Sequence, residues 1–164
     1  MSNPAPSDVR VRVAEDPADR EACFAVRKEV FVAEQGVPED IEYDAFDALG
    51  GDTVHVLAEG PDGPLGTGRL LYGPAAADRT GGDLGVGALG RLAVLQAARG
   101  LGVGAALVRG LERAAAQRGL RAVDLHAQTH ALGFYERLGY QAYGPEFEDA
   151  GIPHRAMRRE LRES

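Results

Sequence analysis

Alternating hydrophobic and polar residues predict most of the strands in this chain. Near the N-terminus, Val9, Val11 and Val13 alternate with two arginines, which is the period-2 pattern of a half-buried strand. Further strands are predicted over residues 53–59, 65–72, 88–95 and 121–128, with a weaker candidate over 154–161. The segment 60–64, Gly-Pro-Asp-Gly-Pro, has the composition of a hairpin turn between the second and third of these strands.

Helical spacing of apolar residues predicts three helices. Ala22, Val26 and Val30 recur at this spacing within a helix over residues 18–33, which Asp16 and Pro17 are suited to begin. The others cover residues 102–118 and 129–139. Between these elements, residues 36–52 read as an acidic loop and 73–87 as a flexible one. The order of elements predicts a single α/β domain with a mixed sheet over residues 9–164, after a disordered N-terminus over residues 1–8.

Composition narrows the class of protein. The chain has 164 residues, of which 45% are hydrophobic and 26% charged, as in an ordinary soluble domain. Its one cysteine, Cys23, stands among apolar residues, which favours a buried hydrophobe in a reducing compartment. Because no apolar run reaches about 20 residues and no signal-peptide pattern is present, we expect a cytoplasmic protein without a membrane partner.

Charge is unevenly distributed along the chain. The net charge of −7 argues against nucleic acid as a partner. Residues 1–98 carry a balance of −9 and residues 99–164 one of +2, and residues 29–68 contain ten acids without a lysine or arginine. This asymmetry suits two ligands of opposite charge. It is equally consistent with an acidic surface that merely aids solubility.

A glycine-rich segment lies between a predicted strand and a predicted helix. In Arg99-Gly100-Leu101-Gly102-Val103-Gly104, glycines leave the main-chain N–H groups unobstructed, and the following helix adds its own unpaired donors and partial positive charge. Such a turn suits a pyrophosphate. The segment lacks the Gly-Lys-Ser/Thr of the phosphate loop in nucleoside triphosphatases. The start of the chain also lacks the glycine pattern of dinucleotide-binding folds.

This loop resembles the (Arg/Gln)-x-x-Gly-x-(Gly/Ala) signature of the GNAT acyltransferases. The segment 131–140, Ala-Leu-Gly-Phe-Tyr-Glu-Arg-Leu-Gly-Tyr, is similar to a helix of that family. The resemblance implies a mixed sheet of about six or seven strands flanked by about four helices, with acetyl-CoA as co-substrate. It implies pantetheine pairing along residues 92–94 and pyrophosphate binding by the amides of 101–105. The cofactor-binding residues so implied are Leu92, Ala93, Val94, Arg99, Gly100, Leu101, Gly102, Val103, Gly104, Ala105, Gln128 and Tyr135. Gln128 stands where many members have Asn.

Segments in the first half of the chain, together with residues 151–154, resemble the ElaA-like branch of this family. The resemblance rests on residues 27–35, the pattern Glu42-x-Asp44-x-x-Asp47, and Gly-Ile-Pro-His at 151–154. The resemblance to the GNAT family as a whole implies transfer of an acetyl group to a primary amine, with the Tyr135 hydroxyl near the CoA sulfur. Tyr135 is then the candidate general acid. The amide of Leu92 or Ala93 is the expected oxyanion donor.

The base and the acceptor site are less determined. No carboxylate stands on the strand before the glycine loop, so Glu34 and His126 are the candidate bases. Glu34, Glu42, Asp44 and Asp47 are candidates to attract a cationic amine, or else form a solvated acidic loop. Their spacing does not match a calcium loop, so no metal is expected.

Two other functions are compatible with the pattern. The Arg27-x-x-x-Phe31 and Glu42-x-Asp44-x-x-Asp47 segments also resemble acyl-homoserine-lactone synthases. A non-catalytic acyl-CoA-binding module is the second alternative. The sequence leaves open whether the amine belongs to a small molecule or a protein, and whether the chain forms a homodimer.

Overall fold

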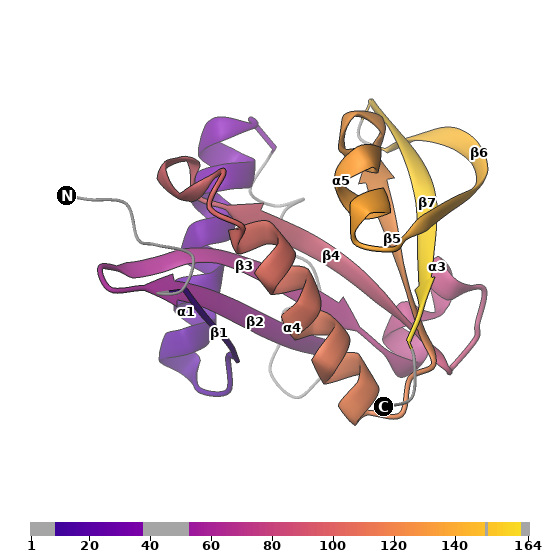
Figure 1. Cartoon of the computed structure of the whole chain (residues 1–164), viewed down its shortest axis with the longest axis horizontal. Coiled ribbons are helices and arrows are strands. Elements are labelled where there is room, and N and C mark those ends of the chain that lie inside the picture. Colours follow the sequence, from indigo (N-terminus) through magenta and orange to yellow (C-terminus); the bar gives the residue numbers. More distant parts are fainter. Residues whose placement is uncertain (1–8, 38–52, 150, 162–164) are drawn as a thin grey trace.

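The computed structural model describes residues 9–37, 53–149 and 151–161, and a seven-stranded mixed sheet runs through them (Figure 1). The strand order is β1-β2-β3-β4-β5-β7-β6. Only β4 and β5 pair in parallel among these neighbours; the other pairs are antiparallel. The strands are β1 (Arg10–Val13), β2 (Thr53–Gly60), β3 (Gly63–Leu71), β4 (Val86–Val94), β5 (Ala122–Gln128), β6 (Gln141–Asp149) and β7 (Ile152–Glu160).

Helix α1 (Pro17–Arg27) covers one face of the sheet and continues as the π-helical η2 (Lys28–Glu34). Its start is fixed by Asp16, whose side chain accepts a hydrogen bond of 2.8 Å from the Asp19 amide, and by Pro17 at the first helical position. Val26 and Val30 pack from this segment against Ala93 of β4.

Helix α4 (Val103–Gln117) crosses the opposite face, in front of the strands in Figure 1. It buries Leu107, Val108 and Leu111 in the main core. The close approach requires Gly66 in β3, because a Cβ there would lie 2.8 Å from the Ala93 oxygen and 2.9 Å from Leu107 Cδ1. The short helix α5 (Leu132–Arg137) follows the turn η6 (Thr129–Ala131) and packs against β5 and β6.

The observed sheet and helices confirm the predicted α/β class and mixed sheet. The segment 73–87 differs from the expected loop, because it contains the turn η4 (Gly73–Ala76) and the helix α3 (Ala77–Thr80) before β4 begins at Val86. Strand β6 was not predicted at all. Glu42, Asp44 and Asp47 lie outside the described residues, as does the segment 1–8.

Strands β4 and β5 separate along their second halves. Their pairing ends at Leu89 opposite Leu125, although β4 continues to Val94 and β5 to Gln128. A bulge causes the separation, since Arg69 of β3 faces Gly90 whereas Thr67 faces Ala93, which leaves an extra residue in β4. Arg91, within this bulge, adopts a left-handed φ of 51°. Beyond Leu89, the sheet therefore has an opening at its centre.

Candidate active site

A pocket of about 450 Å³ lies at the opening between β4 and β5. On the face covered by α4, its lining includes Val108 and Tyr135. On the face of α1, it includes Phe31, His126 and His154. Side chains from both faces of the sheet thus line one continuous space, and two ligands could meet there from opposite sides.

The glycine loop and the start of α4 lie beside this opening. Gly102 is the N-cap of α4 and has a left-handed φ of 80°. The Ala106 amide donates to the Gly102 carbonyl at 3.1 Å, whereas within the described residues no main-chain acceptor is recorded for the amides of 101–105. These amides point outward from a helix N-terminus, where the partial charge is positive. The local geometry fits an anion such as a pyrophosphate.

Beyond the bulge, the β4 edge that faces the opening is available for pairing. Ala93 and Val94 pair with β3 on one side only, through Thr67 and Gly66. Leu92 lines the pocket. The position of residues 92–94 is therefore compatible with the implied pairing along this strand.

Glu34 lies at the glycine loop. Arg99 Nη2 donates to Glu34 Oε1 at 2.9 Å and lies 2.7 Å from Oε2 of the same carboxylate, and Arg99 Nε donates to the Val94 carbonyl at 3.1 Å. In the part of the chain that the structure describes, the neighbouring Gln35 lines the pocket while Glu34 does not. The ion pair connects the end of η2 with the loop before α4, and Glu34 as base remains a prediction.

Tyr135 lines the pocket from α5. Its ring packs edge-to-face against Phe134 and Tyr140, with centroids 4.9 Å and 6.0 Å away. Burial raises the pKa of the Tyr135 hydroxyl to about 12, because desolvation disfavours the phenolate. The hydroxyl therefore keeps its proton throughout the neutral range and is able to act as an acid.

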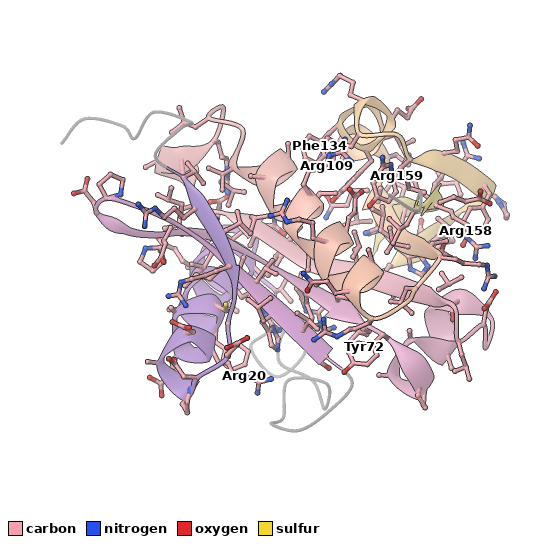
Figure 2. The ribbon with its side chains drawn as sticks, turned by 60° about the horizontal axis from the view of Figure 1, so that its bottom comes forward. Arg20, Tyr72, Arg109, Phe134, Arg158 and Arg159 are labelled. Atoms are coloured by element: carbon pink, nitrogen blue, oxygen red, sulfur yellow. The ribbon has the colours of Figure 1, made fainter. Side chains whose placement is uncertain are left out.

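A buried network holds α5 in place. The Tyr140 hydroxyl donates to Glu112 Oε2 at 2.7 Å, and the Tyr140 amide donates to the Tyr135 carbonyl at 3.0 Å. Arg109 of α4 and Arg159 of β7, both labelled in Figure 2, each donate to Glu112 Oε1 at 2.8 Å, so one carboxylate connects α4 with β7. This network supports the position of Tyr135.

His126 and Gln128 project from β5 on the face opposite α4 and line the pocket. The His126 ring meets the Phe147 ring edge-to-face, with centroids 4.9 Å apart. Gln128 Oε1 lies 2.5 Å from His130 Nε2. Thus the structure brings Leu92, His126, Gln128 and Tyr135 to one pocket and places Arg99 and Glu34 together at the loop beside it.

Several residues that line the pocket were not among the site residues predicted from the sequence. They are Phe31, Gln35, Arg91, Asp149, Ile152 and His154. Arg91 depends on the bulge, for which no local pattern gave a signal. His154 was noted within the Gly-Ile-Pro-His segment, but its place in the pocket depends on pairing of β7 with β5.

A second, larger hollow of about 870 Å³ lies beside β6 and β7, lined by Tyr143, Arg158 and Arg159 among others. Its cations are engaged: Arg158 Nε bonds Asp124 at 2.5 Å and Arg159 bonds Glu112. Tyr143 donates to Asp124 at 2.6 Å. These contacts hold β5, β6 and β7 together, and the smaller pocket at the opening remains the candidate active site.

The described residues, 9–37, 53–149 and 151–161, contain neither a membrane-spanning helix nor a cluster of metal-ligating side chains. No helix in these ranges is long and apolar enough to span a membrane. Within the same ranges, no three histidine, cysteine or acidic side chains converge as metal ligands.

Several known proteins are similar to this chain in sequence. The family model of the acetyltransferase (GNAT) domain matches residues 20–161. The uncharacterized N-acetyltransferase YjcF of Bacillus subtilis is 36% identical over 149 residues, which cover 90% of this chain and 97% of YjcF. Protein ElaA of Escherichia coli is 34% identical over 142 residues, covering 85% of this chain and 86% of ElaA.

Solved structures of acetyltransferases and acyltransferases have a similar fold. The crystal structure of Escherichia coli ElaA superposes with a TM-score of 0.78 and 29% identity, covering 93% of this chain and 99% of ElaA. An acyl-CoA N-acyltransferase from Pseudomonas aeruginosa gives a TM-score of 0.75 at 33% identity, covering 93% of this chain and 98% of that one.

Proposed function

This chain belongs to the GNAT acetyltransferase family, in its ElaA-like branch, and is an N-acetyltransferase; we propose that it transfers acetyl from acetyl-CoA directly to a primary amine at the opening between β4 and β5. The pocket lined from both faces of the sheet carries this proposal. It allows the two substrates to approach one point from opposite sides.

The described residues fit acetyl-CoA. The amides of 101–105, which have no recorded main-chain acceptor among the described residues, are suited to hold the pyrophosphate. Arg99, beside them, carries a positive charge, and its pair with Glu34 is solvent-exposed. The edge of β4 at 92–94 would pair with the pantetheine arm. When bound, acetyl-CoA supplies an activated acetyl thioester.

The chain's own residues then handle charge and protons. We place the amide of Leu92 or Ala93 as the donor to the thioester oxygen, where negative charge develops. Tyr135 gives its proton to the departing sulfur. Its raised pKa of about 12 keeps that proton available at every pH at which the enzyme would work. Phe31 and Gln35, on the other face, would form part of the acceptor wall.

A screen of amines tests this function. Purified protein is incubated with acetyl-CoA and polyamines, aminoglycosides, amino-acid amides or a lysine peptide, and free thiol is measured together with the N-acetylated product by mass spectrometry. We expect equal amounts of thiol and acetylated amine with at least one class. A separate reaction with S-adenosylmethionine tests lactone formation. Lactone as the product, or acetyl-CoA binding without transfer to any amine, would overturn the proposal.

A further inference from the structure

We propose that His154 is the general base that accepts the proton of the acceptor amine. This inference rests on the proposed amine acetylation and names the base of that same site. His154 lies on β7, lines the pocket, and is only 9% exposed. Of the bases expected from the sequence, Glu34 is not among the described residues that line this pocket, whereas His126 lines it from β5.

A main-chain contact determines which ring nitrogen of His154 carries the proton. Nδ1 lies 2.7 Å from the Ile152 carbonyl oxygen. A carbonyl oxygen only accepts, so Nδ1 must be the donor. In the neutral ring, Nε2 then holds a lone pair and is able to take a proton. The Ile152 carbonyl also stabilises the charged ring, because Nδ1 keeps its hydrogen bond after Nε2 is protonated.

Packing fixes the orientation of this ring. Phe147 of β6 stacks on it, with centroids 5.9 Å apart and planes 23° from parallel. Phe147 is also the register partner of His154, and Gln128 is its partner on the other side. Paired residues of adjacent strands share a face, so the imidazole lies on the sheet face that carries His126 and Gln128.

The two other candidates are placed differently. Glu34 is bound by Arg99 beside the glycine loop, where its charge is partly compensated. His126 lines the pocket from β5, and its ring meets the Phe147 ring edge-to-face. His154 thus has the donor, the stacking partner and the pocket position together.

Acetyl transfer moves one proton to His154 and one proton from Tyr135. The amine nitrogen forms a bond to the acetyl carbon, and one of its N–H protons passes to Nε2 of His154. The carbon–sulfur bond breaks with its electron pair going to sulfur, which receives the Tyr135 proton. His154 and Tyr135 lie on opposite faces of the sheet, as a base for the entering amine and an acid for the leaving sulfur require. Solvent returns a proton from the His154 imidazolium to the Tyr135 phenolate.

Other ionisable groups line the same pocket or lie on the same face of the sheet as His154. They project from β4, β5, η6, β6 and β7 toward this pocket or along the same face, and comprise Arg91, Asp124, His126, His130, Tyr143, Asp149 and Arg158. Asp124 is paired with Arg158 and accepts from Tyr143, so these three groups compensate one another.

The test uses His154→Asn, whose side-chain amide retains a donor near the Ile152 carbonyl but has no basic nitrogen. The kcat/KM of wild type and variant is measured with one amine from pH 5.5 to 9. The amine's own ionisation is common to both enzymes and cancels in their ratio. We expect a ratio of about 100 or more at pH 8, because loss of a general base costs roughly 10²–10⁴-fold. The ratio should shrink toward low pH, because a general base contributes only while its lone pair is free to accept a proton.

A purely structural role for His154 predicts a different dependence of this ratio on pH. It would lower the rate by the same factor at every pH, so a flat ratio, or one below about fivefold throughout, overturns the assignment. His126→Asn is the competing variant, and we expect its ratio to wild type to stay flat with pH. A pH-dependent ratio for His126→Asn and a flat one for His154→Asn would make His126 the base.

Calorimetry with CoA verifies that each variant keeps the cofactor site, with an expected change in affinity below threefold. If His154→Asn does not bind CoA, His154→Gln is measured in its place. The outcomes separate the two levels of the proposal. A wild-type enzyme that acetylates no amine refutes the proposed function, whereas an active wild type with a flat ratio refutes only the role of His154.

Discussion

Two glycines at opposite ends of α4 offer a matched test of the phosphate loop. Gly102 precedes the helix with a φ of 80°, and Gly119 follows it with a φ of 75°. A Cβ at either position would meet no atom within 4 Å. Alanine therefore introduces the same left-handed strain at both, about 1–2 kcal/mol. For a chain of this length, that corresponds to a fall in Tm of about 2–8 °C in each variant.

Only Gly102→Ala should affect CoA. Relaxation of the strained backbone there would turn the first amides of α4 away from the pyrophosphate. Loss of one charge-assisted hydrogen bond costs about 1.5–3 kcal/mol, which weakens CoA binding roughly 10- to 150-fold. Gly119→Ala, at the far end of the helix, should bind CoA like wild type. Isothermal calorimetry gives the affinities, and urea unfolding gives the stabilities.

One result for the two variants would refute pyrophosphate binding by this loop. If both variants lose the same stability and bind CoA with wild-type affinity, the amides of 101–105 do not hold the pyrophosphate. The strain common to the pair would then account for everything measured, and the phosphate site would have to be sought elsewhere on the molecule.

Further predictions concern the acid, the ion pair and the buried network. Tyr135→Phe should lower kcat about 100-fold or more, with CoA affinity within a few fold, in a thiol-release assay. The pKa of Tyr135 rises from about 10 in the unfolded chain to about 12 in the folded one, so its contribution to the free energy of unfolding is fully present below pH 10 and is lost as the pH rises toward 12. Urea unfolding of wild type and Tyr135→Phe across that pH range would measure this loss. Glu34→Gln breaks an exposed pair with Arg99 worth about 0–1 kcal/mol, so we expect KM for acetyl-CoA to change less than fivefold and kcat little; a 100-fold loss of kcat would identify Glu34 as the base. Tyr140→Phe removes the donor to the buried Glu112 and should reduce the free energy of unfolding by about 1.5–3 kcal/mol, measured in urea.

Local patterns predicted much of the sheet and helix α4. The strands over 53–59 and 121–128 agree with β2 and β5 to within one residue, because apolar residues in these segments face a packed core. Helix α4 was predicted within one residue at each end, since its apolar stripe and its flanking glycines are both local signals.

Strand β6 and the opening in the sheet could not be predicted in the same way. Most of β6 is exposed, and Gly144 and Pro145 interrupt it, so it has no alternating apolar pattern. The opening depends on a bulge at Arg91, a non-glycine residue with positive φ. The place of His154 depends on pairing between segments that are distant in sequence. Such features follow from tertiary packing, which a local pattern does not encode.

A crystal structure of the protein with CoA would test the central claim most directly, namely that the opening between β4 and β5 is where acyl transfer occurs. We expect the pyrophosphate to contact the amides of 101–105 and the sulfur to lie in the opening, within hydrogen-bonding distance of the Tyr135 hydroxyl. CoA bound instead in the larger hollow beside β6 and β7, or with its sulfur away from this opening, would contradict it.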